Sequence, residues 1–158
     1  MLKILEFIIP IKKEEVMESL EKMKQLENQI SSNNLTNSNQ ALNLAKEISG
    51  IPLIYYPWGL QAAGIRFKNS LQENAKMHTM IEDIVETSHN GIVAWENKSN
   101  VFPILLQGDD DNIKTKERWK IIKNYFDTNK IEYKEVLSIK GNILSKLMHL
   151  IYLLDYTS

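Results

Sequence analysis

A glutamate, a lysine and a histidine that lie close together in the sequence are the residues best suited to chemistry. Glu73 and Lys76 belong to one helix-like segment, and His89 follows the glutamate by sixteen residues, next to Asn90. Proteins can tune the pKa values of carboxyl and imidazole groups toward neutrality, so these groups can move protons at carbon and at sugar-ring oxygens. We therefore expect function to lie between Arg66 and Asn90.

The first part of this block predicts a helix over residues 61–77. Arg66, Asn69, Glu73 and Lys76 recur at intervals of three or four residues, which would place them on one narrow helix face. A separate apolar stripe consists of Ala63, Phe67, Leu71 and Ala75. An ordinary surface helix with a Glu73–Lys76 ion pair, worth less than about 1 kcal/mol, has the same pattern. The pattern alone leaves both interpretations open.

The remaining polar motifs favour structural roles. His89 lies among small polar residues, as exposed loop histidines do, and His149 lies in an apolar segment, where we expect a core or interface role. These two and His78 lack metal-ligand spacing, so no metal site is expected. The aspartates at 109–111 lie between a strand and a helix, which predicts N-capping. The Ser/Asn-rich segment 31–39 has no glycine and follows no strand, so we expect a linker rather than a phosphate-binding loop.

Composition argues against several classes of protein. The net charge is −1 and no Lys/Arg-rich run occurs, so no nucleic-acid or membrane-surface partner is expected. The absence of cysteine excludes disulfides, thiolate catalysis and thiolate zinc sites. A chain without disulfides fits the cytoplasm. Residues 1–9 are apolar but short and interrupted by Glu6, unlike a signal peptide. Residues 143–154 are too short to span a bilayer. We expect a cytoplasmic protein with no membrane segment.

Helix-type and strand-type periodicities alternate along the chain. Helices are predicted at 12–30, 40–49, 61–77, 113–129 and 142–156, and strands at 51–56, 101–107 and 131–139. Such alternation predicts a three-layer α/β/α sandwich with a mostly parallel sheet, preceded by a long amphipathic helix. Asn37 or Asn39 is expected to cap the second helix. Residues 1–36 are predicted to form a helical segment and linker, and residues 37–158 the α/β domain.

Seven short segments between residues 37 and 158 form a further pattern. They are Asn39–Glu47, Ile51–Tyr55, Arg66-x-Lys68, Glu73-Asn74-Ala75-Lys76, Glu86-x-x-His89-Asn90, Trp95-Glu96 and Asp155–Ser158. Together they resemble the C-terminal half of the archaeal and bacterial bifunctional phosphoglucose/phosphomannose isomerases, in the sugar isomerase (SIS) superfamily. The Glu-Asn-Ala-Lys element followed by His-Asn at this separation is fairly specific to that family.

The chain departs from this family in two respects. Val85 stands where the family usually has proline, which predicts only a local change of the loop. The family also has a first SIS domain, whose Ser/Thr-rich loop holds the sugar phosphate, and a catalytic lysine beyond the Asp-Tyr-x-Ser element. Because this chain has neither, we expect half of an enzyme, truncated at its C-terminus, or a subunit that acts with a separate partner half.

The resemblance implies isomerisation of glucose 6-phosphate or mannose 6-phosphate to fructose 6-phosphate. Glu73 would be the base that moves a proton between C1 and C2 through a cis-enediol, and His89 would assist ring opening. Arg66, Lys76 and Asn90 would bind the substrate; Arg66 or Lys76 would stabilise the enediolate or orient Glu73. No metal or organic cofactor is implied. In this superfamily the histidine can reach a neighbouring subunit's site, so a homodimer, or association with a separate first SIS domain, is expected.

Two other functions remain open at this stage. One is a non-catalytic module that binds sugar phosphate or supports assembly, and the other is a helix-rich interaction domain. Glu73 and His89 at the family spacing argue against the second. The apolar residues 1–9 and the apolar last helix predict self-association if a companion domain is absent.

Overall fold

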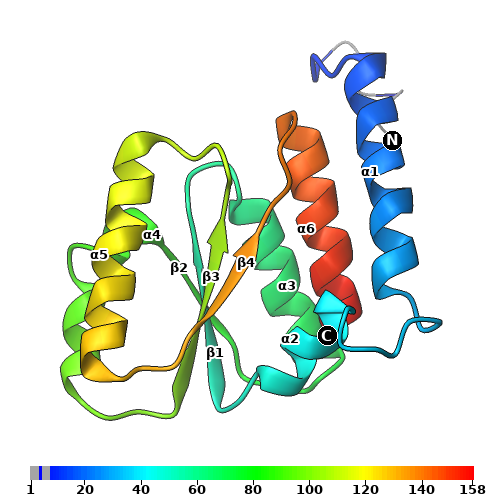
Figure 1. Cartoon of the computed structure of the whole chain (residues 1–158). Helices are drawn as coiled ribbons and strands as arrows, with labels where there is room; N and C mark the ends of the chain where they lie inside the picture. Colours follow the sequence, from blue (N-terminus) through cyan, green and yellow to red (C-terminus); the bar gives the residue numbers. More distant parts are fainter. Residues whose placement is uncertain (1–3, 5–7) are drawn as a thin grey trace.

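Four parallel strands form one sheet in the order β2-β1-β3-β4 (Figure 1). The computed structural model describes residue 4 and residues 8–158. The strands are β1 (Ile51–Tyr56), β2 (Met80–Asp83), β3 (Val101–Gln107) and β4 (Lys134–Leu137). The two central strands, β1 and β3, pair from Ile51↔Val101 to Tyr55↔Leu105. The two central strands are therefore longer than the two edge strands.

Helices cover both faces of this sheet, which confirms the predicted three-layer α/β/α sandwich. One face carries α2 (Gln40–Glu47), α3 (Gln61–Glu73) and α6 (Ile143–Thr157), with α1 (Lys13–Ile30) packed along α6. The other face carries α4 (Ile84–Thr87), the short 3-10 helix η1 (Gly91–Glu96) and α5 (Ile113–Asn129).

Alternation of side chains along the central strands creates two hydrophobic cores. Ile54 and Ile104 point toward α3 and α6, whereas their neighbours Tyr55 and Leu105 point toward α5, and all four are fully buried. Strands buried on both faces read as continuous apolar runs. This explains why 51–56 and 101–107 were recognisable as strands.

Three predicted elements are shorter in the structure by two residues or more. The helix predicted over 61–77 ends at Glu73, the helix predicted over 40–49 ends at Glu47, and the strand predicted over 131–139 is limited to Lys134–Leu137. Strand β2 was not predicted. It has only four residues, two of them acidic, and Met80 is exposed, so no apolar run marks it.

Segment 31–39 is a linker, as predicted, and Asn39 organises it. Its side-chain oxygen accepts the Leu42 N–H at 3.0 Å, which confirms Asn39 as the cap of α2. Its amide nitrogen donates to the carbonyls of Ile30 and Asn34, at 3.1 and 2.7 Å. One buried asparagine therefore joins the end of α1 to the start of α2.

The prediction that the aspartates at 109–111 cap α5 is wrong. Asn112 is the cap, and its side chain accepts the Lys114 N–H at 2.9 Å. Asp111 instead accepts the Gly108 N–H and so closes the turn after β3. The other two aspartates pair with lysines at the start of α6: Asp109 with Lys140, just before the helix, and Asp110 with Lys146, in its first turn.

The apolar N-terminal segment lies largely outside the described residues, since 1–3 and 5–7 are not among them. Ile4 and Ile8 are exposed. Within the part of the chain that the structure describes, no helix has the length and apolar character needed to cross a membrane.

Phe67 provides a test of the core between the sheet and α3. Its side chain is fully buried, so Phe67→Ala should lower the free energy of unfolding by about 3–5 kcal/mol, because it removes apolar contacts and leaves a cavity. Chemical denaturation measures this. The exposed Ile121→Ala should cost less than about 1 kcal/mol. Equal losses in the two variants would contradict this description of the core.

Candidate active site

Helix α3 presents the candidate base on its solvent-exposed side. Ala63, Phe67 and Leu71 are buried against the sheet and α6, as the apolar stripe predicted, whereas Arg66 and Glu73 are exposed. The fourth member of that stripe, Ala75, lies beyond the helix and is exposed. The helix is thus fixed by its inner face, and its outer face is available for contacts.

The end of α3 separates Lys76 from the predicted helix face. Lys76 has a left-handed backbone (φ 58°), which an α-helix does not accommodate, and the Met77 N–H returns to the Leu71 carbonyl at 3.2 Å. The Lys76 ammonium donates to the main-chain carbonyl of Glu73 at 2.6 Å. The prediction that Lys76 shares a helix face with Glu73 is therefore wrong, and the ion pair of the surface-helix interpretation is not formed. Lys76 closes the helix end.

This arrangement leaves the Glu73 carboxylate open to solvent. Glu73 is the last residue of α3 and is exposed, and its carboxylate has no hydrogen bond or ion pair within the described residues. It can therefore accept a proton or a hydrogen bond from a molecule outside the chain.

Arg66 is bound to the last turn of α6 rather than to Glu73. Its Nε and Nη2 donate to the two oxygens of Asp155, each at 3.0 Å, and the Ser70 hydroxyl donates to the same carboxylate at 2.7 Å. Hydrogen bonds to Asp155, and then its negative charge, raise the pKa of the Arg66 guanidinium. Asn74 adds a bond to the Ser158 hydroxyl at 2.9 Å. A bidentate pair of this kind fixes orientation, so Arg66 positions α3 against α6.

His89 and Asn90 close the short helix α4. Both of their N–H groups donate to the Glu86 carbonyl, at 2.9 and 3.0 Å, and both side chains are exposed. At the start of α4, Asp83 accepts the Val85 N–H at 2.7 Å. A proline at position 85 has no N–H to donate, so the valine supports a cap that a proline would not.

The structure places the candidate base and the candidate histidine on helices that cover opposite faces of the sheet (Figure 1). Glu73 ends α3 on the face shared with α6, and His89 follows α4 on the face shared with α5. No hydrogen bond or ion pair joins them in the described part of the chain. The two candidate residues therefore lie on different sides of the sheet and do not form a bonded pair.

A pocket of about 740 Å³ lies beside edge strand β2, next to the His89–Asn90 segment. Lys68 from α3, Glu82 from β2 and Trp95 from η1 line it. The sequence did not identify Glu82 as a site residue, because β2 was not predicted. Lys68 belongs to the Arg66-x-Lys68 element, but it was not assigned a role. The Trp95 indole N–H donates to the Tyr55 hydroxyl at 3.0 Å, which fixes the wall of the pocket. Burial raises the pKa of Tyr55, so its hydroxyl stays neutral.

His149 is buried in α6, as predicted, but it is not a satisfied core residue. Its Nδ1 is buried without a hydrogen-bond partner in the described structure, and burial lowers the pKa of the imidazole. Neither His149 nor its surroundings form a metal centre: among the described residues, no group of three or more potential ligands could hold a metal ion.

Residues 37–158 match the model of the family described as the bacterial phospho-glucose isomerase C-terminal SIS domain. The chain belongs to this family. That region contains both α3 and the His89–Asn90 segment, so the candidate residues lie inside the SIS domain. A search of curated proteins finds no match.

Solved structures share the fold of this SIS domain. A glucose-6-phosphate isomerase like protein from Thermus thermophilus aligns with a TM-score of 0.74 and 18% identity over 92% of this chain, which spans 50% of that protein. A putative sugar-phosphate isomerase from Listeria monocytogenes str. 4b F2365 aligns with a TM-score of 0.57 and 10% identity, over 92% of this chain and 87% of that one. A putative phosphosugar isomerase involved in capsule formation, from Bacteroides fragilis NCTC 9343, aligns with a TM-score of 0.55 and 9% identity, over 90% of this chain and 86% of that one.

Acidification should destabilise the SIS domain through His149. In the unfolded chain this histidine has its ordinary pKa of about 6.5, and in the folded chain the pKa is lower, so the unfolded state binds the proton first. The free energy of unfolding should fall as the pH drops below about 6.5. Denaturation at a series of pH values should show that the free energy of unfolding of His149→Leu depends less steeply on pH than that of the wild type. The exposed His78→Gln should keep the wild-type slope; loss of the slope in His78→Gln alone would contradict this assignment.

Asp155 provides a test of the contact between α3 and α6. Asp155→Ala should speed hydrogen exchange at the last turn of α6, because Arg66 and Ser70 lose their shared acceptor. The matched change Asp110→Ala removes an ion pair to Lys146 near the other end of α6 and should leave that turn protected. Unchanged exchange in Asp155→Ala would show that the bidentate pair does not hold the helix end.

Proposed function

We propose that this SIS domain is the C-terminal half of an isomerase that converts glucose 6-phosphate or mannose 6-phosphate to fructose 6-phosphate. The chain belongs to the phospho-glucose isomerase C-terminal family, and it is an α/β domain of the sugar-phosphate isomerase kind. The observation that carries the proposal is the Glu73 carboxylate, exposed at the end of α3 and without a partner among the described residues, in the family's Glu-Asn-Ala-Lys element. We also expect the protein to act in the cytoplasm.

Glu73 would be the base of this reaction. Its carboxylate would remove the proton from C2 of the open-chain aldose and return it to C1 of the cis-enediol, which gives the ketose without net consumption of a proton. General bases work best when water is excluded around them. In this chain Glu73 is exposed, so the covering surface would come from another domain or subunit.

His89 would act on the sugar ring in a site built from two chains. Its imidazole would transfer a proton between the C1 hydroxyl and the ring oxygen, which opens the ring before isomerisation. A site shared between subunits is supported by the position of His89, on the opposite face of the sheet from Glu73. We therefore propose a homodimer or an assembly with a separate first SIS domain.

The three substrate-binding residues would have different tasks. Asn90 has an exposed side-chain amide that makes no capping bond to η1, so it could bind a sugar hydroxyl. Arg66 uses Nε and Nη2 for Asp155, which leaves Nη1 as a donor toward substrate. The Lys76 ammonium lies at the Glu73 carbonyl and would contribute positive charge near the base. Neither Arg66 nor Lys76 would orient the Glu73 carboxylate directly.

A second candidate function is a non-catalytic SIS module that binds sugar phosphate or supports assembly. The separation of Glu73 from His89 favours this alternative for the chain acting alone. Activity measurements on the chain with and without a first SIS domain distinguish the two functions.

We expect little or no turnover of fructose 6-phosphate by the isolated chain, and measurable turnover when a first SIS domain is supplied. In that assembly, Glu73→Gln should lower kcat by about 10²- to 10⁴-fold, the range of general acid–base catalysis. A coupled assay of glucose 6-phosphate formation measures this. The matched change Glu132→Gln, at an exposed glutamate outside the candidate site, should have little effect. Robust turnover by the isolated chain would contradict the proposal that its active site needs a second domain.

Mixing two inactive variants tests whether the site is shared. Glu73→Gln and His89→Gln assemblies should each be nearly inactive, but subunit exchange between them should restore activity, because a mixed dimer can form one site with both native side chains. No recovery in dimers shown to have exchanged subunits would indicate that both residues act within one chain, or that His89 is not needed.

A further inference from the structure

The outer edge of β4 presents main-chain groups that no strand uses. Strand β4 is the last strand of the sheet, and it pairs only with β3. The Ser138 N–H donates to the Gln107 carbonyl at 2.8 Å. In a parallel ladder alternate residues bond to the same neighbour, so Val136 also faces β3, and the N–H and C=O groups of Glu135 and Leu137 point away from the sheet. None of these groups has a backbone partner in the described residues.

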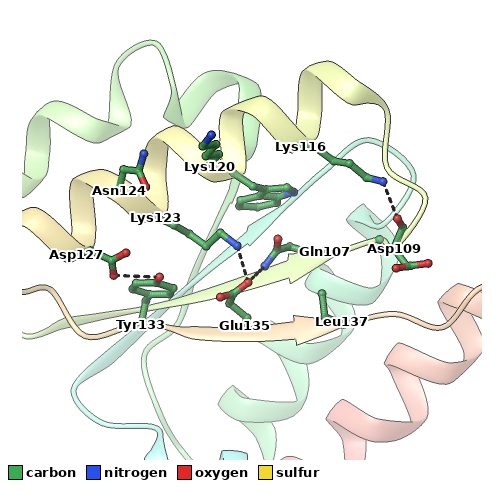
Figure 2. Close-up of a pocket in the computed structure, with 12 residues that line it drawn as sticks. Gln107, Asp109, Lys116, Lys120, Lys123, Asn124, Asp127, Tyr133, Glu135 and Leu137 are labelled. Atoms are coloured by element: carbon green, nitrogen blue, oxygen red, sulfur yellow. Dashed lines mark hydrogen bonds and ion pairs between the residues drawn. The ribbon is translucent and has the colours of Figure 1, made fainter.

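The charged side chains of β4 do not protect this edge. Exposed lysines and glutamates usually block an edge strand by projecting over it. Here the Lys134 ammonium pairs with Glu47 at 2.9 Å. The Glu135 carboxylate accepts from Lys123 at 2.9 Å and from the Gln107 amide at 2.6 Å (Figure 2). Both side chains are tied to the body of the domain, which leaves the edge open.

Two pockets flank β4, one on each face of the sheet. A pocket of about 510 Å³ lies between β4 and α5, and Figure 2 shows the side chains that line it. A pocket of about 610 Å³ lies on the other face, between β4, α2 and α6. Side chains of an extended segment point alternately to opposite faces. A strand added at β4 would therefore place alternate side chains in the two pockets, as in proteins that bind peptides by strand addition.

Two of the lysines that line the pocket beside α5 have no carboxylate partner among the described residues. Within the described residues Lys120 has no hydrogen bond or ion pair, and the Lys116 ammonium donates only to the main-chain carbonyl of Asp109, at 2.8 Å. Three carboxylates line this pocket: Asp109 pairs with Lys140, Glu135 pairs with Lys123, and Asp127 accepts the Tyr133 hydroxyl. Lys116 and Lys120 can therefore bind an acidic side chain.

The pocket on the other face suits an apolar or small side chain. Leu44, Val136 and Leu153 form part of its wall. His149 also lines it, with a buried Nδ1 that no described group satisfies. The charged residues that line this pocket are paired, Glu47 with Lys134 and Glu135 with Lys123.

We propose that the outer edge of β4 binds an extended segment of a partner protein in which acidic and apolar residues alternate. The segment adds a fifth strand to the sheet through the main-chain groups of Glu135 and Leu137. Its acidic side chains contact Lys116 and Lys120, and its apolar side chains enter the pocket lined by His149. This surface lies at the opposite edge of the sheet from β2 and uses neither Glu73 nor His89. The interaction is therefore independent of the proposed catalytic activity.

The probe is a synthetic peptide, blocked at both ends, in which glutamate and valine alternate, and binding to the full chain is measured by fluorescence anisotropy. The glutamate peptide should bind at least about tenfold more tightly than a peptide with lysine in place of glutamate. The double variant Lys116→Gln, Lys120→Gln should weaken binding by about three- to tenfold, as expected for two exposed ion pairs. Equal affinity for the two peptides would overturn the charge assignment and the proposal with it.

Leu137 separates strand addition from simple charge attraction. Leu137→Pro removes an N–H that points away from β3, a place where edge strands tolerate proline, and should abolish binding. Leu137→Ala keeps the N–H and should bind within about threefold of wild type. If the proline variant does not fold, a peptide N-methylated on its pairing edge replaces it and should not bind. Binding that survives the proline or the N-methyl groups overturns the proposal, as does no detectable binding of the glutamate peptide.

The oligomeric state distinguishes a partner segment from a second copy of this chain. Any dimer formed by the chain should persist in Leu137→Pro, because the proposed dimer serves the site of Glu73 and His89 rather than the β4 edge. A dimer that dissociates in Leu137→Pro but not in Leu137→Ala, measured by analytical ultracentrifugation, would show that β4 pairs with itself and would overturn the proposal.

Discussion

Every other feature of this domain depends on the burial of both faces of its central strands. Neighbouring residues such as Ile54 and Tyr55 point into two different cores, and both side chains are fully buried. Parallel strands of this kind require helices on both faces. The chain therefore passes from α3 on one face, through β2, to α4 on the other. The same constraint that builds the core distributes the candidate catalytic residues over two sides of the molecule.

The sequence was sufficient to predict the parts of the fold that have long, regular patterns. Strands 51–56 and 101–107 and the helix at 113–129 have the predicted bounds, because apolar runs and helical spacing persist over their whole length. Strand β2 was missed because Met80-Ile81-Glu82-Asp83 is too short and too polar to show a period. The end of α3 was missed because Lys76 takes a left-handed conformation that its residue type does not indicate.

The residues of the candidate site could also be predicted, but not their positions relative to one another or their bonding partners. Glu73 and His89 stand in motifs that are visible in the sequence, whereas their placement on opposite faces follows from the chain path through β2. The partner of Arg66 could not be predicted, since Asp155 lies 89 residues further along the chain. The family resemblance instead suggested that Arg66 could orient Glu73. Long-range pairs between polar residues leave no periodic signal, and only the packing of α6 against α3 brings this pair together.

The cap of α4 couples two positions close to the candidate histidine. Asp83 and Val85 act as one unit, because the carboxylate of the first accepts the N–H of the second. A residue without an N–H at position 85, such as proline, would leave that carboxylate without its donor, so the effects of substitutions at positions 83 and 85 should not be additive. Position 85 lies only four residues before the histidine of the candidate site, so a change in this cap would reach the segment that carries His89.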